Sequence, residues 1–258
     1  MASQPIYQFY AELKDYEPKI WRRFQLMNNI TMARLGYILM TLFEMQASHL
    51  FCFDVHVIDN LRKSMEGRDT KVSIDLMVDM FQKNPKHSEL RVELIDEDSF
   101  FGFEGRVLDA AETKVKHILT EKMETMTFSY DYGDGWEIEL ILEETDADKE
   151  LSGNELPRVL EGEGYGIIED CGGPGGLQEL TKAFKEKKGP QYQQYTEWLG
   201  VEELDLFSFD LEDMNFRLKK VPRIYKDVYE HGLKPTRQSI NLLMREYKKY
   251  GIEDWKEE

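Results

Sequence analysis

The sequence predicts an α+β fold, with a mixed or antiparallel sheet and packed helices followed by a mainly helical C-terminal region. Segments in which apolar and polar residues alternate recur before residue 145 and indicate half-buried strands. Apolar residues at helical spacing separate some of these segments and dominate after residue 177. The chain has 258 residues and is 41% hydrophobic, which is enough for a proper core.

The first strands are expected in IYQFYAEL (6–13) and KIWRRFQL (19–26), joined by the turn KDYEP into a hairpin. Thr31 is a suitable N-cap for a helix over 32–47. Later residues give four further strands and one further helix. The strands are HLFCFDVHV (49–57), ELRVELI (89–95), MTFSYDY (126–132) and WEIELILEE (136–144), and the helix spans about 107–122.

A tight hairpin is predicted at FSYDYGDGWEIEL, residues 128–140. Asp134-Gly135 favours a type I′ turn, whose two central residues need positive φ, and Gly133 adds freedom. In the strand that follows, Trp136 begins a row of apolar residues on one face. Glu137 and Glu139 lie on the other face and are expected to point to water.

The second half of the chain contains a glycine-rich loop and then helices. Residues 161–176, EGEGYGIIEDCGGPGG, hold seven glycines and are not expected to form regular structure. Helices are expected near 177–184, near 192–199 and after KPT (234–236). We therefore expect an α+β domain over residues 1–185 and a helical C-terminal extension with a basic segment over 186–258.

The chain is strongly acidic, with a formal net charge of −17. This disfavours nonspecific contact with DNA or anionic lipid. No apolar run approaches the roughly 20 residues of a membrane span. The two cysteines and the absence of a visible secretory signal indicate a cytoplasmic protein. The acids are concentrated in residues 89–170, with 24 acidic and 7 basic residues, whereas 217–249 has 10 basic and 3 acidic residues.

Six residues in or near the two turn-rich stretches are candidate ligands of a divalent metal. They are His49, Asp131, Asp134, Glu169, Asp170 and Cys171. No CxxC, HExxH or histidine-rich spacing supports them, and no catalytic residue or cofactor is assigned. The alternative is structural: the acids accept hydrogen bonds from the amides of the glycine-rich loop, Cys171 is packed, and His49 is a hydrogen-bonded histidine.

A basic segment near the C-terminus contains two helical stretches flanking HGLKPT, which loosely suggests a helix-turn-helix. Its candidate nucleic-acid-binding residues are Arg217, Lys219, Lys220, Arg223, Arg237, Lys248 and Lys249. The alternative is that these helices are solvated or pack on the acidic domain.

Four ordered motifs resemble the plasmid pRiA4b ORF-3-like family: PKIWRRFQL, HLFCF, FSYDYGDGWEIEL and EGEGYGIIEDCGGPGG. The resemblance covers about residues 5–185 and implies an α+β domain. Its structural motif residues are Trp21, Arg22, Gly133, Gly135, Trp136, Gly172 and Gly173. Two positions depart from the family pattern. Ile138 stands where the hairpin usually has His, which weakens a His-dependent reaction, and Ile167-Ile168 replace the usual Pro-Pro.

Three functional hypotheses follow. The first is an accessory protein of mobile-element type that acts by binding a protein with a basic surface, as a DNA mimic that inhibits a nucleic-acid-binding protein would. The second is a metal-dependent hydrolase or nuclease built on the six candidate ligands. The third is a DNA-binding protein that uses the basic tail. None of them involves a membrane.

Overall fold

The computed structural model describes residues 4–66, 74–95, 103–148 and 150–243. One mixed sheet of eight strands runs through these residues in the order β5-β4-β3-β6-β7-β1-β2-β8. Only the β4–β5 pair is parallel, so the α+β prediction is confirmed. The strands are β1 (Ile6–Leu13), β2 (Trp21–Met27), β3 (Phe51–Val55), β4 (Leu90–Glu93), β5 (Arg106–Asp109), β6 (Thr125–Tyr130), β7 (Trp136–Glu144) and β8 (Arg158–Glu163).

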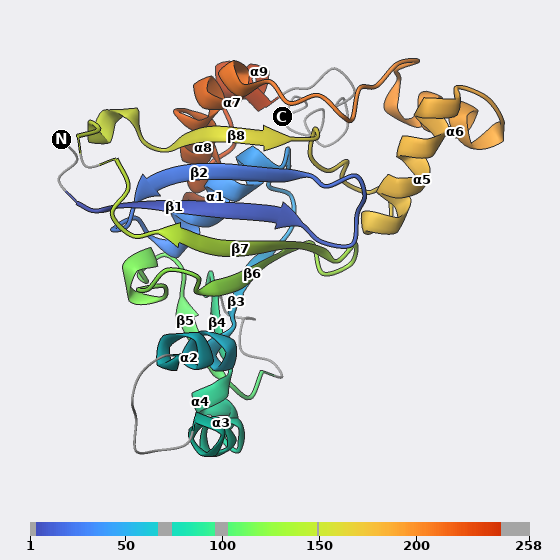
Figure 1. Ribbon diagram of the computed structural model, residues 1–258. Coiled ribbons are helices and arrows are strands. Elements are labelled where there is room, and N and C mark those ends of the chain that lie inside the picture. The colour runs from blue at the N-terminus through green and yellow to red at the C-terminus, as the bar shows by residue number, and fades with distance from the viewer. Residues whose placement is uncertain (1–3, 67–73, 96–102, 149, 244–258) are drawn as a thin grey trace.

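Helices cover one face of the sheet and form two projecting groups (Figure 1). In that view α1, α7 and α8 lie behind the sheet, while the face of β1, β2 and β7 toward the viewer carries no helix. The group α2–α4 projects at the bottom and α5–α6 at the right. The helices are α1 (Met32–Leu42), α2 (Val57–Met65), α3 (Ile74–Gln82), α4 (Pro85–Ser88), α5 (Gly173–Glu186), α6 (Pro190–Leu199), α7 (Leu211–Leu218), α8 (Val221–His231) and α9 (Arg237–Leu243).

Strand alternation sets which residues enter the core. β1 and β2 pair antiparallel as predicted, with Phe9 opposite Phe24, and both rings are fully buried. β6 and β7 also pair antiparallel, and Trp136, Ile138 and Leu140 turn inward. Burying each such side chain stabilises the fold by roughly 1.5–3 kcal/mol. The predicted hairpins and the inward face of β7 are therefore confirmed.

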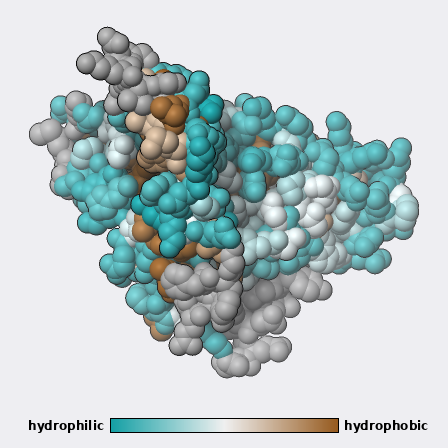
Figure 2. Space-filling model, turned by 90° about the horizontal axis from the view of Figure 1, so that it is seen from below, coloured by the Kyte–Doolittle hydropathy of each residue, from teal (hydrophilic) through white to brown (hydrophobic). Residues whose placement is uncertain are grey.

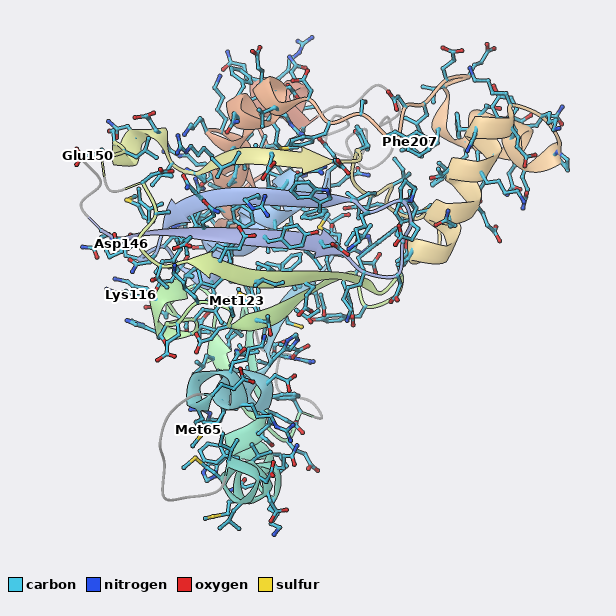
Figure 3. All side chains as sticks on the ribbon, in the orientation of Figure 1. Met65, Lys116, Met123, Asp146, Glu150 and Phe207 are labelled. Carbon is cyan, nitrogen blue, oxygen red and sulfur yellow. The ribbon has the colours of Figure 1, made fainter. Side chains whose placement is uncertain are left out.

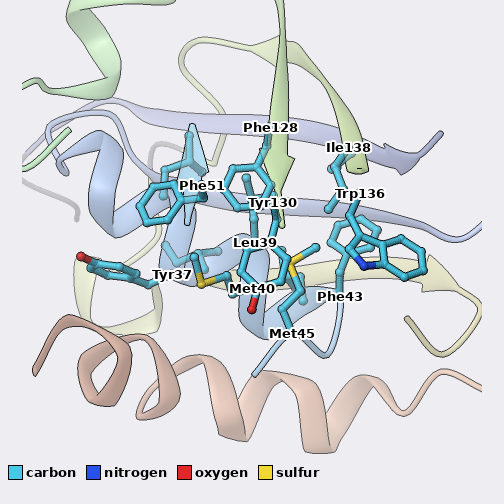
Figure 4. Packing of buried hydrophobic residues seen from close by; sticks show 14 of the residues in the cluster. Tyr37, Leu39, Met40, Phe43, Met45, Phe51, Phe128, Tyr130, Trp136 and Ile138 are labelled. Atoms are coloured by element: carbon cyan, nitrogen blue, oxygen red, sulfur yellow. The ribbon is translucent and has the colours of Figure 1, made fainter. Parts of the chain in front are cut away.

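Helix α1 is buried nearly all round because it lies between the sheet and the C-terminal helices (Figure 4). Thr31 is its N-cap, as predicted, and its side chain accepts the Arg34 N–H at 3.2 Å. The helix ends at Leu42 rather than 47, because Glu44 has a positive φ of 62°. The chain is thereby turned toward the loop that carries His49.

The helix predicted over 107–122 is wrong. Residues 106–109 form β5 beside β4, and the Asp109 carboxylate accepts the Ala111 N–H at 2.8 Å to begin a turn. A single 3-10 turn, Val115–His117, follows. Val115 and Leu119 are buried at the spacing of one helical turn, so the pattern located core residues but not the backbone conformation. Pairing with β4 outweighed local helix preference.

The glycine-rich stretch is more regular than predicted. Its first three residues complete β8, and its last four begin α5, whose left-handed Gly172 stands at the N-cap. Only residues 164–172 form the irregular connection. This connection leads from the sheet edge to the hairpin tip of β6 and β7.

The C-terminal helices complete the sheet layer. The Asn215 side chain of α7 donates to the Val159 carbonyl at 3.0 Å and accepts the Val159 N–H at 2.9 Å, which covers the edge of β8. Leu218 and Tyr225 join the same hydrophobic cluster as Phe9 and Trp136. The boundary at residue 185 stays a prediction, although hydrophobic residues on both sides of it share this cluster.

Across the described ranges, no helix combines the length and the apolar character that crossing a membrane requires. Seen from below, most of the visible surface is hydrophilic, with a narrower band of hydrophobic residues (Figure 2).

Candidate metal centre

The tip of the β6–β7 hairpin is a five-residue loop, Asp131–Gly135, because Tyr130 pairs with Trp136. Positive φ occurs at Asp131 (53°) and Gly135 (69°), and the Gly135 N–H donates to the Asp131 carbonyl at 2.7 Å. The predicted type I′ turn at Asp134-Gly135 is therefore wrong, since Asp134 does not have positive φ. Asp131 Oδ1 accepts the Gly133 N–H at 3.0 Å, so this carboxylate organises the loop.

Arg22 fixes the connection that approaches this tip. Its side chain is fully buried and donates to five backbone carbonyls, three of which belong to Glu163, Gly164 and Tyr165. Burial lowers the pKa of this guanidinium, and the nearby Glu44 carboxylate opposes the shift. The IWRR motif thus supports the loop that leads to Glu169 and Asp170.

Glu169 is buried and accepts three hydrogen bonds. It accepts the Gln46 N–H at 2.5 Å, the Ser48 hydroxyl at 2.8 Å and the Tyr130 hydroxyl at 2.7 Å. These bonds join the loop before β3, the end of β6 and the glycine-rich connection. Glu169 therefore helps to position its neighbours His49 and Asp170, although its donors are not the glycine-loop amides of the structural alternative.

Close backbone contact explains two glycines after Cys171. A Cβ on Gly173, where φ is 70°, would lie 2.2 Å from the Asp134 carbonyl oxygen. A Cβ on Gly176 would lie 1.7 Å from the Cys171 carbonyl oxygen. Only glycine lets the start of α5 pack directly on the hairpin tip.

Three of the six predicted ligands converge between these loops: His49, Asp131 and Asp170. His49 Nε2 lies 3.5 Å from Asp131 Oδ2 and 3.8 Å from Asp170 Oδ1, and the three donor atoms lie within 4.8 Å of one another. The imidazole stands edge-on to the Tyr130 ring, with centroids 5.7 Å apart. Both separations exceed a hydrogen bond.

The cluster is open on one side. The Asp170 side chain is 67% exposed, His49 32% and Asp131 11%. Burial raises the pKa of Asp170, as do the negative charges of Glu169, Asp134 and Asp131, while His49 lowers it. Several carboxylates therefore repel one another here, and a bound cation would relieve that repulsion. Asp131 also lines a groove of about 280 Å³ with Arg91 and Tyr132.

The other three predicted ligands lie outside the cluster. Glu169 is engaged as described, and Asp134 Oδ2 is buried without a partner among the described residues. Cys171 Sγ donates to the Gly173 carbonyl at 3.7 Å. Burial, with a contribution from Asp134, raises the pKa of its thiol to about 12. A catalytic cysteine needs a lowered thiol pKa, because the thiolate is the reactive form.

Ile138 does not belong to the tip. Its side chain is fully buried on the inner face of β7 (Figure 4). The histidine that the family resemblance led us to expect at this position would therefore enter the core of this chain, and the cluster of His49, Asp131 and Asp170 does not include the position.

The basic tail residues have mixed surroundings. Arg217 is buried against Glu44, which removes it from any surface for nucleic acid. Lys219 donates to the Glu155 and Pro157 carbonyls, and Lys220 lies over the Phe216 ring at 4.0 Å. Arg223 and Arg237 are exposed. Lys248 and Lys249 lie outside the described residues.

The supporting residues Tyr130 and Ser48 were missed by sequence reasoning. Tyr130 was predicted only as part of a strand, although a buried tyrosine hydroxyl normally needs a partner. Ser48 lies just before a strand, and no sequence motif around it indicated a role in the site. Their shared partner, Glu169, is 121 residues from Ser48 in the sequence.

Fold and site together define an α+β protein with a histidine–carboxylate cluster at one hairpin tip. The chain belongs to the plasmid pRiA4b ORF-3-like family, whose sequence profile matches residues 5–217. The match extends beyond residue 185, where the resemblance was expected to end, and includes most of α7.

The chain is similar to one curated protein and to one solved structure. The uncharacterized protein y4hQ of Sinorhizobium fredii (strain NBRC 101917 / NGR234) is 33% identical over 88 residues, which are 34% of this chain and 44% of that protein. The crystal structure of MM3350, a protein of unknown function from Methanosarcina mazei Go1, has a TM-score of 0.60 at 20% identity. That similarity covers 81% of this chain and 97% of the other, and shows a shared fold.

Proposed function

We propose that the protein binds a divalent cation through His49, Asp131 and Asp170 and uses it to activate water for hydrolysis. The observation that carries this proposal is the convergence of three donor atoms within 4.8 Å from three segments distant in sequence. Around an ion held at about 2.1 Å, neighbouring donor atoms lie roughly 3.0–3.4 Å apart. The distances from His49 Nε2, 3.5 and 3.8 Å, need only small side-chain rotations to reach that range, and the two carboxylates must close from at most 4.8 Å.

The donor set favours catalysis over a purely structural metal. One imidazole and two carboxylates leave coordination positions for water and substrate, whereas structural zinc sites use four protein ligands. A bound divalent cation lowers the pKa of its water and supplies a nucleophile near neutral pH. The groove beside Asp131 offers a place for the substrate.

Metal titration tests the binding step. Purified protein is stripped with chelator and titrated with Zn²⁺ or Mn²⁺ by calorimetry, and we expect about one equivalent bound. His49→Ala and Asp170→Asn should each weaken binding by at least about tenfold. Asp79→Asn, which changes an exposed aspartate of α3, is the matched control and should bind as wild type. If the wild type does not bind about one equivalent of either metal ion, the proposal is wrong.

A chromogenic panel tests the reaction. The metal-loaded protein is assayed on nitrophenyl esters of phosphate, phosphodiester and acetate. We expect the protein to hydrolyse one of these three classes of ester. The activity should be lost when chelator is added and in the Asp170→Asn variant. Metal binding without turnover of any class would leave a metal-binding protein and overturn the hydrolase assignment.

A second candidate is the cytoplasmic accessory protein that binds a partner with a basic surface. The favouring observation is the helix-free sheet face, where Glu12, Glu137 and Glu143 line the central strands. Glu161 and Glu163 are exposed on the edge strand β8. Part of this charge is neutralised by ion pairs of Lys14, Lys19 and Arg23. These pairs engage Glu12, Glu137 and Glu143, and Arg23 also pairs with Glu161. A face of this sign suits a nucleic-acid-binding protein.

Charge neutralisation tests that candidate. Host proteins are captured on the wild type and on a Glu161→Gln/Glu163→Gln variant at two salt concentrations. We expect the wild type to capture basic, nucleic-acid-binding proteins. High salt should release them, and the variant should capture less of them. This candidate is wrong if no protein is captured, or if the captured proteins stay bound both at high salt and on the Glu161→Gln/Glu163→Gln variant.

A further inference from the structure

The groove beside the candidate metal centre crosses strands β4, β3 and β6. In Figure 3, as in Figure 1, these strands lie between β7 and the projecting helices α2 to α4. The volume of the groove is about 280 Å³. Small-molecule sites begin at roughly 300 Å³, so the groove suits a compact ligand with one ring system. Asp131 lines the groove and also belongs to the cluster with His49 and Asp170, so a ligand in the groove can reach the proposed cation.

Tyr132, at the hairpin tip, gives the groove an exposed aromatic side chain. This residue is 54% exposed. Burial raises the pKa of its hydroxyl, and its hydrogen bond with the Cys52 thiol adds to the shift. The bond anchors the hydroxyl end of Tyr132 over β3. An anchored and exposed aromatic ring is a stacking surface for another planar ring.

A second planar group in the groove is the guanidinium of Arg91, on β4. Its Nε and Nη2 atoms donate to the two carboxylate oxygens of Asp54 at 2.8 and 3.1 Å. Its Cζ atom lies 4.6 Å from the centroid of the Phe103 ring. These contacts fix the orientation of the guanidinium, while the bonds to Asp54 use two of its five N–H donors. The other donors can bond to a ligand.

The floor of the groove adds further hydrogen-bonding groups. The Ser129 hydroxyl belongs to β6, and in the strand register Ser129 lies opposite Glu137 of β7. Asp54 has more lone pairs than its bonds to Arg91 use. The carboxylate of Asp54 is paired with Arg91. The carboxylate of Glu137 lies 2.7 Å from Lys14. Recognition in this groove therefore depends on stacking and hydrogen bonds rather than on net charge.

We infer that the groove binds a nucleobase, so that the hydrolase proposed above acts on a nucleoside phosphate. The base stacks on Tyr132, its carbonyl or ring nitrogen accepts from Arg91, and its N–H groups donate to Asp54. Proteins hold unpaired bases by this combination of aromatic or guanidinium stacking with polar groups at the base edge. The phosphate then lies toward Asp131. Base binding depends on the groove alone, whereas the place of the phosphate rests on the proposed metal function.

NMR titration of the chelator-treated, full-length protein tests base binding without any cation. The probes are guanosine and ribose, which lacks the ring. We expect guanosine to shift the backbone amide signals of Ser129 and Tyr132, and ribose to shift neither. The inference is wrong if guanosine shifts neither signal, or if ribose binds equally well.

Variants of Tyr132 test the stacking surface. Tyr132→Ala should weaken guanosine binding at least about tenfold, because the stacked ring is lost. Tyr132→Phe keeps the ring and should bind nearly as wild type. Phe216→Ala is the matched control, since it removes a ring of 52% exposure from α7 and should leave the affinity unchanged. Wild-type affinity in Tyr132→Ala, with circular dichroism showing it folded, would contradict the inference, as would equal losses in Tyr132→Ala and Tyr132→Phe.

Calorimetry with Mn²⁺ tests where the phosphate lies. With the cation present, guanosine 5′-phosphate should bind at least about tenfold more tightly than guanosine, because the cation attracts the phosphate. This gain should vanish in Asp170→Asn. If the protein binds guanosine but no Mn²⁺, the proposed metal function is wrong and the base site stands. If it binds both without the gain, only the place of the phosphate is wrong.

A last probe distinguishes a nucleobase from a simple aromatic ring. Phenyl phosphate carries the ring and the phosphate but lacks the hydrogen-bonding edge of a base. We expect it to bind more weakly than guanosine 5′-phosphate in the presence of Mn²⁺. Equal affinity would overturn the nucleobase assignment in favour of aryl phosphates.

Discussion

The Arg217 guanidinium of α7 lies 2.6 Å from the Glu44 carboxylate beyond the end of α1, and each side chain is only 4% exposed. The contact spans 173 positions in the sequence. Arg217 belongs to the basic segment but is buried inside the protein. Its ion pair with Glu44 connects the C-terminal helices to the end of α1. Such a pair fixes one arrangement of these helices, since either charge alone would be costly to bury.

Removing one partner should therefore destabilise the fold strongly. We expect Arg217→Met to lower the free energy of unfolding by about 3–5 kcal/mol, because Glu44 is left buried without this cation. The double variant Arg217→Met/Glu44→Gln should recover part of this loss. Urea denaturation followed by circular dichroism measures both values.

The exposed pair Lys83–Asp79 is the matched control for that measurement. Lys83→Met should change the free energy of unfolding by less than about 0.5 kcal/mol, since a solvated pair contributes little. Equal effects of Lys83→Met and Arg217→Met would show that the buried contact has no special role.

Two glycines near the hairpin tip should respond differently to alanine. Gly135→Ala meets only the cost of a positive φ, roughly 1–2 kcal/mol, because a Cβ there has no atom within 4 Å. Gly173→Ala has a positive φ and a contact of 2.2 Å with the Asp134 carbonyl, so it must displace α5 from the tip. We expect Gly173→Ala to lose more stability and also metal affinity. Similar thermal melting and metal titration for the two variants would contradict this.

Glu169 should act on the metal through its neighbours. Glu169→Gln replaces an acceptor of three hydrogen bonds beside His49 and Asp170, and we expect cation affinity to fall about 10–100-fold. Tyr130→Phe removes one donor and should have a smaller effect. Calorimetric titration with Mn²⁺ gives the affinities, and circular dichroism shows whether each variant is folded. Wild-type affinity in folded Glu169→Gln would leave this residue a purely structural role.

Sequence patterns predicted those parts of the fold that local periodicity controls. The hairpin of β1 and β2, the strands on either side of Asp131–Gly135 and the inward face of β7 follow from alternation. The region 107–122 was assigned wrongly because its β5 strand is stabilised by β4, which no local pattern reports. The loop at Asp134-Gly135 was misassigned since a five-residue turn also ends on glycine.

The candidate site was predicted as a set of six residues, and the structure selects three. That selection depends on where the loops of His49, Asp131 and Asp170 end in space, which is fixed by long-range contacts. The Glu169 hydrogen bonds and the Arg22 bonds to carbonyls are such contacts. Arg217 shows a limit of predicting from charge. Its charge suggested a surface residue that binds nucleic acid, whereas in the structure it is buried and pairs with Glu44.

The two thiols should react slowly in the folded protein. Burial raises the pKa of Cys52 to about 11 and that of Cys171 to about 12. Thiolate is the reactive form, so at pH 8 no more than about one molecule in a thousand is reactive at either position. Between pH 8 and 10, the rate of iodoacetamide labelling should rise about tenfold per pH unit without reaching a plateau.

Mass spectrometry of peptides containing each cysteine measures these rates, and the urea-unfolded protein is the control. Unfolding should return both thiols to ordinary pKa values near 8.5 and accelerate labelling at pH 8 by more than about tenfold. A folded Cys171 that labels rapidly at pH 7 would indicate an activated thiolate. It would favour a nucleophilic role for Cys171, beside Asp170, over the water-activating cation proposed for this tip.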